Sequence, residues 1–203
     1  MTCRSINKRR RSNSAFTMIE AVLAITIMAL AGSILLLGTT ASLETTKNGM
    51  YGAIARGMAQ QLMDEIVGCM YFEPGVDPHS TILGPDGSEA AGGTRQYYDD
   101  SDDFNGLRTM PPKDFYGIAL GKDDGLGGQR NSLFQIPAGL IDNWQQEVDV
   151  YYVSETNLST KLPTGQTSDY RVVEVRITAN NPGQGTQVLA TLKRVLSYVP
   201  PMQ

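Results

Sequence analysis

The most pronounced hydrophobic pattern in the chain is an almost unbroken apolar run from Ala21 to Leu37. Residues 16–38, which include this run, would form a helix about 34 Å long at about 1.5 Å per residue. That length crosses a hydrocarbon core of about 30 Å, and it exceeds the apolar region of roughly 7–15 residues in a cleaved signal peptide. We therefore expect residues 16–38 to be the transmembrane half of an N-terminal helix.

The helical pattern continues beyond the apolar run, but with one apolar face. Large apolar residues recur every four positions, at Met50, Ile54, Met58, Leu62 and Ile66. Polar residues occupy another face, which is typical of an amphipathic helix. We predict that residues 39–70 are the amphipathic half of the same helix, which ends before Pro74-Gly75, and that the stripe from Met50 to Ile66 packs on the protein's own domain.

The rest of the chain divides into an irregular middle and an alternating C-terminal part. Residues 71–144 are rich in Gly, Pro and Asp and form a variable region, with short apolar pieces at 115–120 and 133–136 as strand candidates. Three later segments alternate between apolar and polar residues as strands do: Glu147–Ser154, Arg171–Thr178 and Gly185–Tyr198.

These segments predict an α+β fold. A long helix followed by an antiparallel meander buries its apolar stripe when residues 145–203 form a sheet that packs on it. The last strand changes phase between Leu192 and Val195, which predicts a bulge or a bend at that point.

Charge is distributed very unevenly along the chain. Of 17 Lys and Arg residues, five precede residue 16, where no acid occurs; the remainder has 12 basic against 21 acidic residues. The basic cluster predicts a cytoplasmic N-terminus and an external C-terminal domain, because positive flanks stay inside. The acidic remainder argues against general nucleic-acid binding, because it would repel a phosphate backbone.

One carboxylate, Glu20, lies at the start of the apolar run. A charge inside a spanning helix costs about 2–3 kcal/mol or more, depending on its depth. Two interpretations remain open: the side chain reaches the membrane edge, or assembly supplies a partner charge.

The segment Ser14–Ala24, with the sequence SAFTMIEAVLA, resembles the processing site of type IV prepilins and type II secretion pseudopilins. The resemblance implies that residues 1–15 are a basic leader, which a prepilin peptidase removes by cleavage between Ala15 and Phe16. It further implies N-methylation of Phe16 and a role for Glu20 in aligning subunits, by pairing with a neighbour's N-terminal amine. The family prefers glycine before the cut, whereas this chain has Ala15.

Two other segments are similar to minor subunits of this family. Residues 59–66 are similar to minor pilins and pseudopilins of the I or V type, and residues 97–106 to pilin-like proteins of the mannose-sensitive haemagglutinin group. The resemblance implies a pilin-like fold and a minor structural subunit of a periplasmic or surface fibre, in a type II secretion or type IV pilus system. Within the same architecture, the alternative to a secretion subunit is a subunit of a competence or adhesion system.

The resemblance also implies partners and a location. The partners are other pilin or pseudopilin subunits, a prepilin peptidase and an inner-membrane assembly platform. The protein would cross the inner membrane once, with its C-terminal domain in the periplasm, and would then enter a pilus or pseudopilus.

An acidic segment is the one candidate for metal binding. It contains several hard oxygen ligands of the kind that calcium prefers: Asp99, Asp100, Asp102, Asp103 and Asn105. It does not match an EF-hand loop, because no glutamate follows at the far end. The alternatives are a Ca²⁺ site and a solvated acidic turn.

The sequence predicts no catalytic site. His79 is the only histidine, and no phosphate-binding loop, nucleophile elbow or zinc-binding helix is present. We therefore expect a structural protein without any cofactor other than the candidate calcium ion. The alternative from another class is a signal-anchored periplasmic enzyme or ligand-binding domain.

Overall fold

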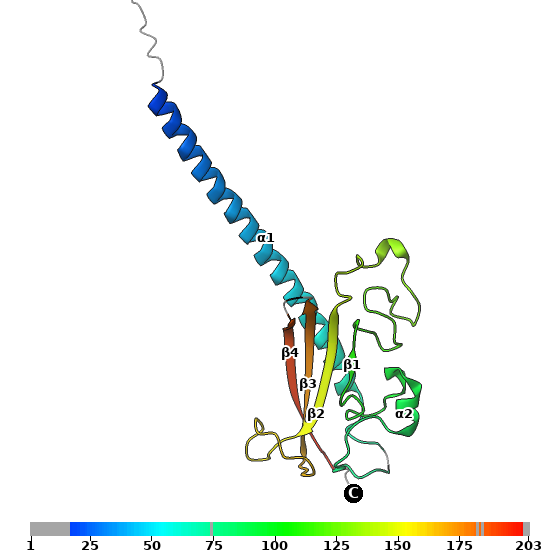
Figure 1. The fold of residues 1–203 in the computed structure, drawn as a ribbon. Helices are drawn as coiled ribbons and strands as arrows, with labels where there is room; N and C mark the ends of the chain where they lie inside the picture. The colour runs from blue at the N-terminus through cyan, green and yellow to red at the C-terminus, as the bar shows by residue number, and fades with distance from the viewer. Residues whose placement is uncertain (1–16, 74, 182, 184, 201–203) are drawn as a thin grey trace, which may run out of the picture. The chain divides into compact units, whose positions relative to one another are not determined.

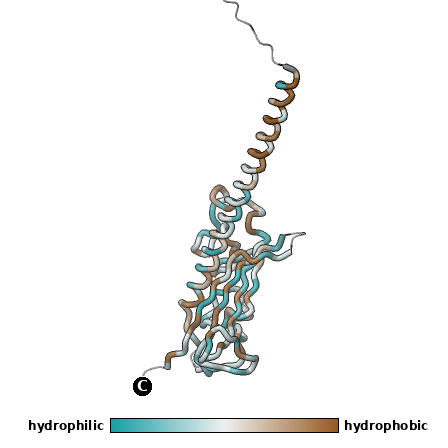
Figure 2. Tube along the Cα trace, turned by 90° about the vertical axis from the view of Figure 1, so that its left-hand side faces the viewer, coloured by the Kyte–Doolittle hydropathy of each residue, from teal (hydrophilic) through white to brown (hydrophobic). Residues whose placement is uncertain are grey.

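The computed structural model describes residues 17–200 except Pro74, Pro182 and Gln184. It divides into two compact units, residues 1–48 and 49–203, and helix α1 (Met18–Gly68) contributes to both. In the first unit, the described residues from Met18 onward form the N-terminal part of α1, whose apolar run is coloured mostly brown in Figure 2, and every one of them is exposed. The predicted helical character of the apolar run is confirmed, and Phe16 lies outside the described residues.

In the second unit, the remainder of α1 packs against a sheet (Figure 1). Its buried residues are Ala55, Met58, Ala59, Leu62, Met63 and Ile66. The predicted apolar stripe is confirmed over these turns, but it is wrong for Met50, which is 47% exposed. The packing starts instead at Tyr51, whose ring meets Trp144 edge-on at 5.5 Å.

Over the described residues, the sheet has four strands in the order β1-β2-β3-β4, and all neighbours are antiparallel. The strands are β1 (Arg108–Thr109), β2 (Trp144–Tyr152), β3 (Tyr170–Asn181) and β4 (Gly185–Ser197). The α+β meander predicted from the sequence is thus confirmed. Alternate residues of β2 are buried, and Val173, Val175 and Ile177 of β3 complete the core against α1.

The bulge or bend predicted between Leu192 and Val195 is wrong in position, because the described part of β4 pairs with β3 in unbroken register there. The register shifts at Ile177 and Thr178 of β3, which pair with Ala190 and Val188 of β4. Val195 needs no bulge because it pairs with Val172, on the face of the sheet that also carries Glu174 and Lys193. Apolar residues therefore occur on both faces of this part of the sheet. Along the sequence, this looks like a break in the alternation of apolar and polar residues, although the strand itself is regular there.

The variable region contains little regular structure. Its described residues form helix α2 (Gly87–Gly92), the 3₁₀ turns η1 (Arg95–Tyr97) and η2 (Ser132–Phe134), and strand β1. The strand candidates at 115–120 and 133–136 are wrong, because neighbouring polar side chains bind the backbone locally. Asp114 accepts from the Ile118 N–H at 2.7 Å, and Asn131 accepts from the Leu133 N–H at 3.0 Å.

Candidate functional site

The first candidate site is the apolar part of α1. It is long and apolar enough to cross a membrane, with a mean hydropathy of 2.4 over its most apolar stretch, and none of that stretch is buried within the protein. Its hydroxyl groups are satisfied within the helix: Thr26 and Ser33 each donate to the carbonyl three residues earlier, at 2.8 Å. Such a surface favours lipid or a neighbouring helix over water.

Glu20 lies exposed in the first turn of α1, where a carboxylate complements the positive end of the helix dipole. Its neighbours Met18, Ile19 and Leu23 are exposed apolar side chains. Over the described residues, no ion pair to Glu20 is formed. The predicted cleavage site between Ala15 and Phe16, and with it the leader, lies outside the described residues.

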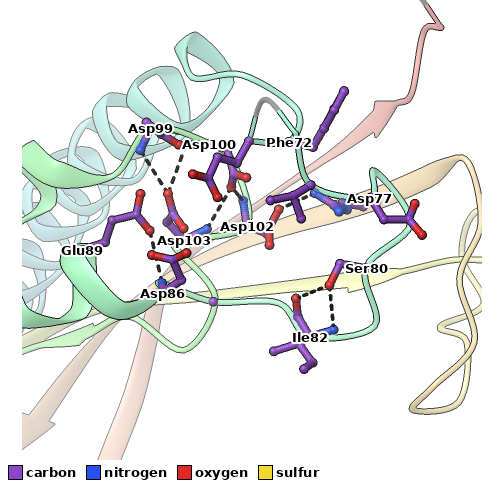
Figure 3. Close-up of a pocket in the computed structure, with 14 residues that line it drawn as sticks. Phe72, Asp77, Ser80, Ile82, Asp86, Glu89, Asp99, Asp100, Asp102 and Asp103 are labelled. Carbon is purple, nitrogen blue, oxygen red and sulfur yellow. Dashed lines mark hydrogen bonds and ion pairs between the residues drawn. The ribbon is translucent and has the colours of Figure 1, made fainter.

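The second candidate site is an acidic cavity of about 180 Å³ beside the segment predicted to bind metal (Figure 3). Glu89 of α2, Asp99 and Asp103 each offer one oxygen atom, and these atoms lie within 4.8 Å of one another. Carboxylate oxygens in such a group are ligands of the type that calcium takes.

The same carboxylates organise the backbone of the acidic segment. Asp103 Oδ2 accepts from the N–H groups of Asp99 at 3.0 Å and Asp100 at 3.1 Å. Asp100 Oδ1 accepts from the N–H groups of Asp102 at 2.7 Å and Asp103 at 3.3 Å. These bonds close the turn by themselves, so a calcium site and an acidic turn without an ion both remain compatible with the geometry.

Two predicted ligands face other partners. Asp102 forms an ion pair with Arg171 at 2.6 Å. Asn105 accepts from the Val150 N–H at 2.9 Å and donates to the Leu83 carbonyl at 3.0 Å, which ties the segment to β2. Glu89 joins the group although the sequence did not single it out, because α2 brings it in from outside the acidic segment.

Among the described residues that line this cavity, Arg171 has the side chain with the most hydrogen-bond partners, and no local sequence pattern marks its role. It is 1% exposed and donates to Asp102, to the carbonyls of Tyr71 and Pro78, and to the hydroxyl of Tyr152. Its guanidinium also lies over the Tyr71 ring at 4.5 Å. Arg171 therefore ties the segment after α1 to the acidic segment and to the sheet.

Burial makes several of these carboxyl groups harder to ionise. Burial raises the pKa of Glu89 to about 7, and a hydrogen bond with Asp103 adds to this effect. Burial also raises the pKa of Asp102 to about 7, although Arg171 opposes the shift. Burial is also the main cause that raises the pKa of Asp103.

These shifts predict a pH-dependent stability. The unfolded chain has carboxyl pKa values near 4, so between about pH 4 and 7 the folded state binds more protons than the unfolded state. The stabilising contribution is complete below the unfolded pKa and is lost as the pH rises through 7. We expect the melting temperature of the full-length protein in detergent to fall between pH 5 and pH 8, and to fall less in Glu89→Gln.

The matched control is Glu155→Gln, which changes an exposed glutamate and should keep the wild-type pH slope. Added Ca²⁺ separates the two interpretations of the cavity. Binding at Glu89 predicts a rise in melting temperature at pH 8 that Glu89→Gln removes, whereas an ion-free turn predicts no rise. Equal pH slopes for the wild type and Glu89→Gln would contradict the role of burial.

No protein-family model, no curated protein and no solved structure matches this chain. Its function is therefore inferred from its residues and geometry.

Cys69 and His79 are the side chains of the described residues most suited to nucleophilic or acid–base chemistry, and both are held in contacts with neighbouring groups. Cys69 is half-buried, and burial, followed by the nearby carboxylate of Glu65, raises the pKa of its thiol to about 11. It stays protonated at neutral pH, and the thiol is a poor nucleophile compared with the thiolate. His79 bonds to Asp169 at 2.7 Å and packs edge-on against Tyr198.

Proposed function

We propose that this protein is a minor type IV pilin-like protein or pseudopilin, a structural subunit of a periplasmic or surface fibre. The observation that carries the proposal is the exposed apolar part of α1, with Glu20 as the only charged residue between Thr17 and Leu43. A helix of this kind needs lipid before assembly and the helices of other subunits after it.

Cleavage after Ala15 would give Glu20 a partner. The new α-amine of Phe16 is a cation at the same end of the helix, and a neighbouring subunit's Glu20 can pair with it. At a separation of about 4 Å, such a pair is worth about 4 kcal/mol in surroundings of intermediate polarity, and less in water. The pair would therefore favour staggered packing of apolar helices over dispersed subunits in the membrane.

The second unit supports this role by folding around its own core. Its part of α1 is buried against β2 and β3, so the unit does not need the apolar part of the helix to complete its core. We infer that this unit lies in the periplasm. The prepilin peptidase, the inner-membrane assembly platform and other pilin or pseudopilin subunits are the partners that follow from this function.

Processing at Ala15 tests the proposal. Coexpression with a prepilin peptidase should convert the chain to a shorter form, and Ala15→Gly should be converted at least as completely because the family prefers glycine there. Ala15→Leu is the matched control and should remain uncut. The readout is the mobility of the chain in membrane fractions with and without the peptidase.

Two results would contradict the proposal. The first is an intact chain for both the wild type and Ala15→Gly when the peptidase is active on a known substrate. The second is cleavage near Ala41 without the peptidase, which would favour the signal-anchored enzyme or ligand-binding domain.

A further inference from the structure

The loop between β2 and β3 carries a sequence pattern that the proposed fibre function does not use. Its residues 155–159 have the sequence ETNLS, and Asn157 is the only asparagine of the chain with Ser or Thr two residues later. Because Leu158 and not a proline stands between them, the segment matches the acceptor sequence for N-glycosylation. A pattern this short is common, so its meaning depends on where the fold places it.

The fold places the segment at the tip of a small exposed hairpin. Val153 and Lys161 pair across the base of the hairpin, and residues 155–160 are all exposed. Over the described residues, the hydrogen bonds of this tip join its residues only to one another or to Ser154. In Figure 1 the loop, coloured gold, extends beyond the end of β2. An enzyme can therefore bind and straighten the tip without opening the core of the sheet.

A turn accounts for only part of the pattern. Asn157 Oδ1 accepts from the Ser159 N–H at 3.1 Å, and the Asn157 carbonyl accepts from the Thr160 N–H at 2.9 Å. The first bond closes an Asx turn, which requires the side chain of the asparagine. It makes no demand on the side chain two residues later, since every residue except proline offers an N–H. The turn thus explains Asn157 and leaves the hydroxyl of Ser159 without a structural role.

The groups that the turn does not use stand at alternate positions. Over the described residues, three polar groups of the tip have no partner within the protein: the Glu155 carboxylate, the Asn157 amide nitrogen and the Ser159 hydroxyl. Side chains two residues apart face the same side of an extended segment. When an enzyme straightens the tip, all three groups therefore face it together.

We propose that Asn157 is N-glycosylated on the periplasmic side of the membrane, with Glu155 and Ser159 as the groups by which the enzyme recognises the acceptor. The co-substrate is an oligosaccharide linked to a polyprenyl diphosphate, and the enzyme is an oligosaccharyltransferase. A bond forms between Asn157 Nδ2 and the anomeric carbon of the first sugar. The bond from that carbon to the diphosphate oxygen breaks, the diphosphate leaves with the electron pair, and a base of the enzyme takes one proton from Nδ2.

The glycan also limits how subunits pack. A bulky hydrophilic group cannot be buried in a contact between subunits, so the tip of this hairpin faces solvent in any assembly. The proposal rests on the periplasmic location that belongs to the proposed function, but not on cleavage, methylation or fibre formation.

Coexpression of the full-length protein with a bacterial oligosaccharyltransferase and its lipid-linked oligosaccharide tests the proposal. Mass spectrometry of the protein purified from membranes should find the tryptic peptide 131–161 with the added mass of one glycan, and fragmentation should place the glycan on Asn157. Asn131 is the internal control, because it is exposed in the same peptide but is followed two residues later by Leu133.

Three variants test the recognition groups. Ser159→Ala keeps the N–H of the Asx turn but should abolish glycosylation, whereas Ser159→Thr should keep it. Glu155→Gln should lower the rate of glycosylation by roughly tenfold, since a contact with a charged group is lost. A wild-type level in Ser159→Ala or in Glu155→Gln would overturn the role of that residue. Glycan on another residue, or an unmodified protein in cells whose transferase modifies a known acceptor, would overturn the whole proposal.

A topology measurement separates this proposal from the proposed function. With Cys3 and Cys69 replaced by Ser, Ile82→Cys, at a position that is 83% exposed, should react with a membrane-impermeant maleimide in spheroplasts. An unmodified Asn157 with a labelled position 82 would overturn glycosylation alone, and an unlabelled position 82 would overturn the periplasmic location as well. A glycosylated Asn157 in a chain that a prepilin peptidase does not cleave would overturn only the proposed function.

Discussion

Replacing Glu20 by alanine is expected to abolish fibre assembly while the protein still inserts into the membrane. Insertion depends on the apolar run and the basic N-terminal residues, and neither changes. Assembly loses the partner of the neighbour's N-terminal amine, so that each subunit contact leaves a cation without its countercharge. A loss of even half of the pair's energy, about 2 kcal/mol, would reduce assembly more than tenfold. The measurement is the amount of this subunit in sheared fibres relative to the membrane fraction.

Glu44→Ala is the matched control for this variant. Glu44 lies exposed on the same helix but outside the apolar run, so its loss should leave assembly close to the wild-type level. Glu20→Gln keeps a polar side chain without the charge and should behave like Glu20→Ala. Normal assembly of Glu20→Ala, or its loss from the membrane, would mean that Glu20 does not have the proposed role.

The second large effect is expected at Arg171. At pH 8, where the Asp102 carboxyl with its pKa of about 7 is mostly ionised in the wild type, Arg171→Met should lower the free energy of unfolding of the full-length protein by about 3–5 kcal/mol, because Asp102 must then stay buried without its countercharge or take up a proton. The carbonyls of Tyr71 and Pro78 lose their donor in the same variant. Denaturant unfolding in detergent measures the change.

Two further variants separate the ion pair from a general loss of packing. Arg194→Met removes an exposed arginine of β4 and should change the free energy of unfolding by less than about 0.5 kcal/mol. The double variant Arg171→Met/Asp102→Asn should be more stable than Arg171→Met alone, since the unpaired charge is gone. If Arg171→Met lowered the free energy of unfolding by less than about 1 kcal/mol, the Arg171–Asp102 pair would contribute no more than an ordinary surface salt bridge, and the prediction would be wrong.

Much of the fold could be predicted because its signals are local and periodic. The four-residue spacing of Met58, Leu62 and Ile66 is a property of one helix, and the alternation of Val173, Val175 and Ile177 is a property of one strand. Both faces are buried as the spacing indicates. The prediction was wrong at Met50, because periodicity shows which face is apolar but not where packing begins.

The candidate site could be predicted only in part, since its geometry depends on contacts between distant segments. The acidic segment was found from its composition, but the direction of each carboxylate depends on which backbone N–H group it accepts from. Glu89 comes from α2, and Arg171 reaches Asp102 across 69 residues of sequence. No local pattern marks such partners, and the short strand β1 is missed because two residues have no period.

The proposed function assigns separate roles to the two units. A variant such as Arg171→Met should reduce the amount of folded protein, whereas Glu20→Ala should leave the melting temperature unchanged because Glu20 belongs to the first unit and the core of the second unit is formed by its own residues. A shift in melting temperature therefore distinguishes a folding defect from an assembly defect in any further variant.

The most direct measurement of the central claim is the N-terminal residue of the protein purified from membranes of cells that make a prepilin peptidase. Mass spectrometry should find a chain that begins at Phe16 and carries one methyl group on its α-amine. A chain that retains Met1, or one that begins near Ala41, would contradict the assignment of α1 as a processed assembly helix.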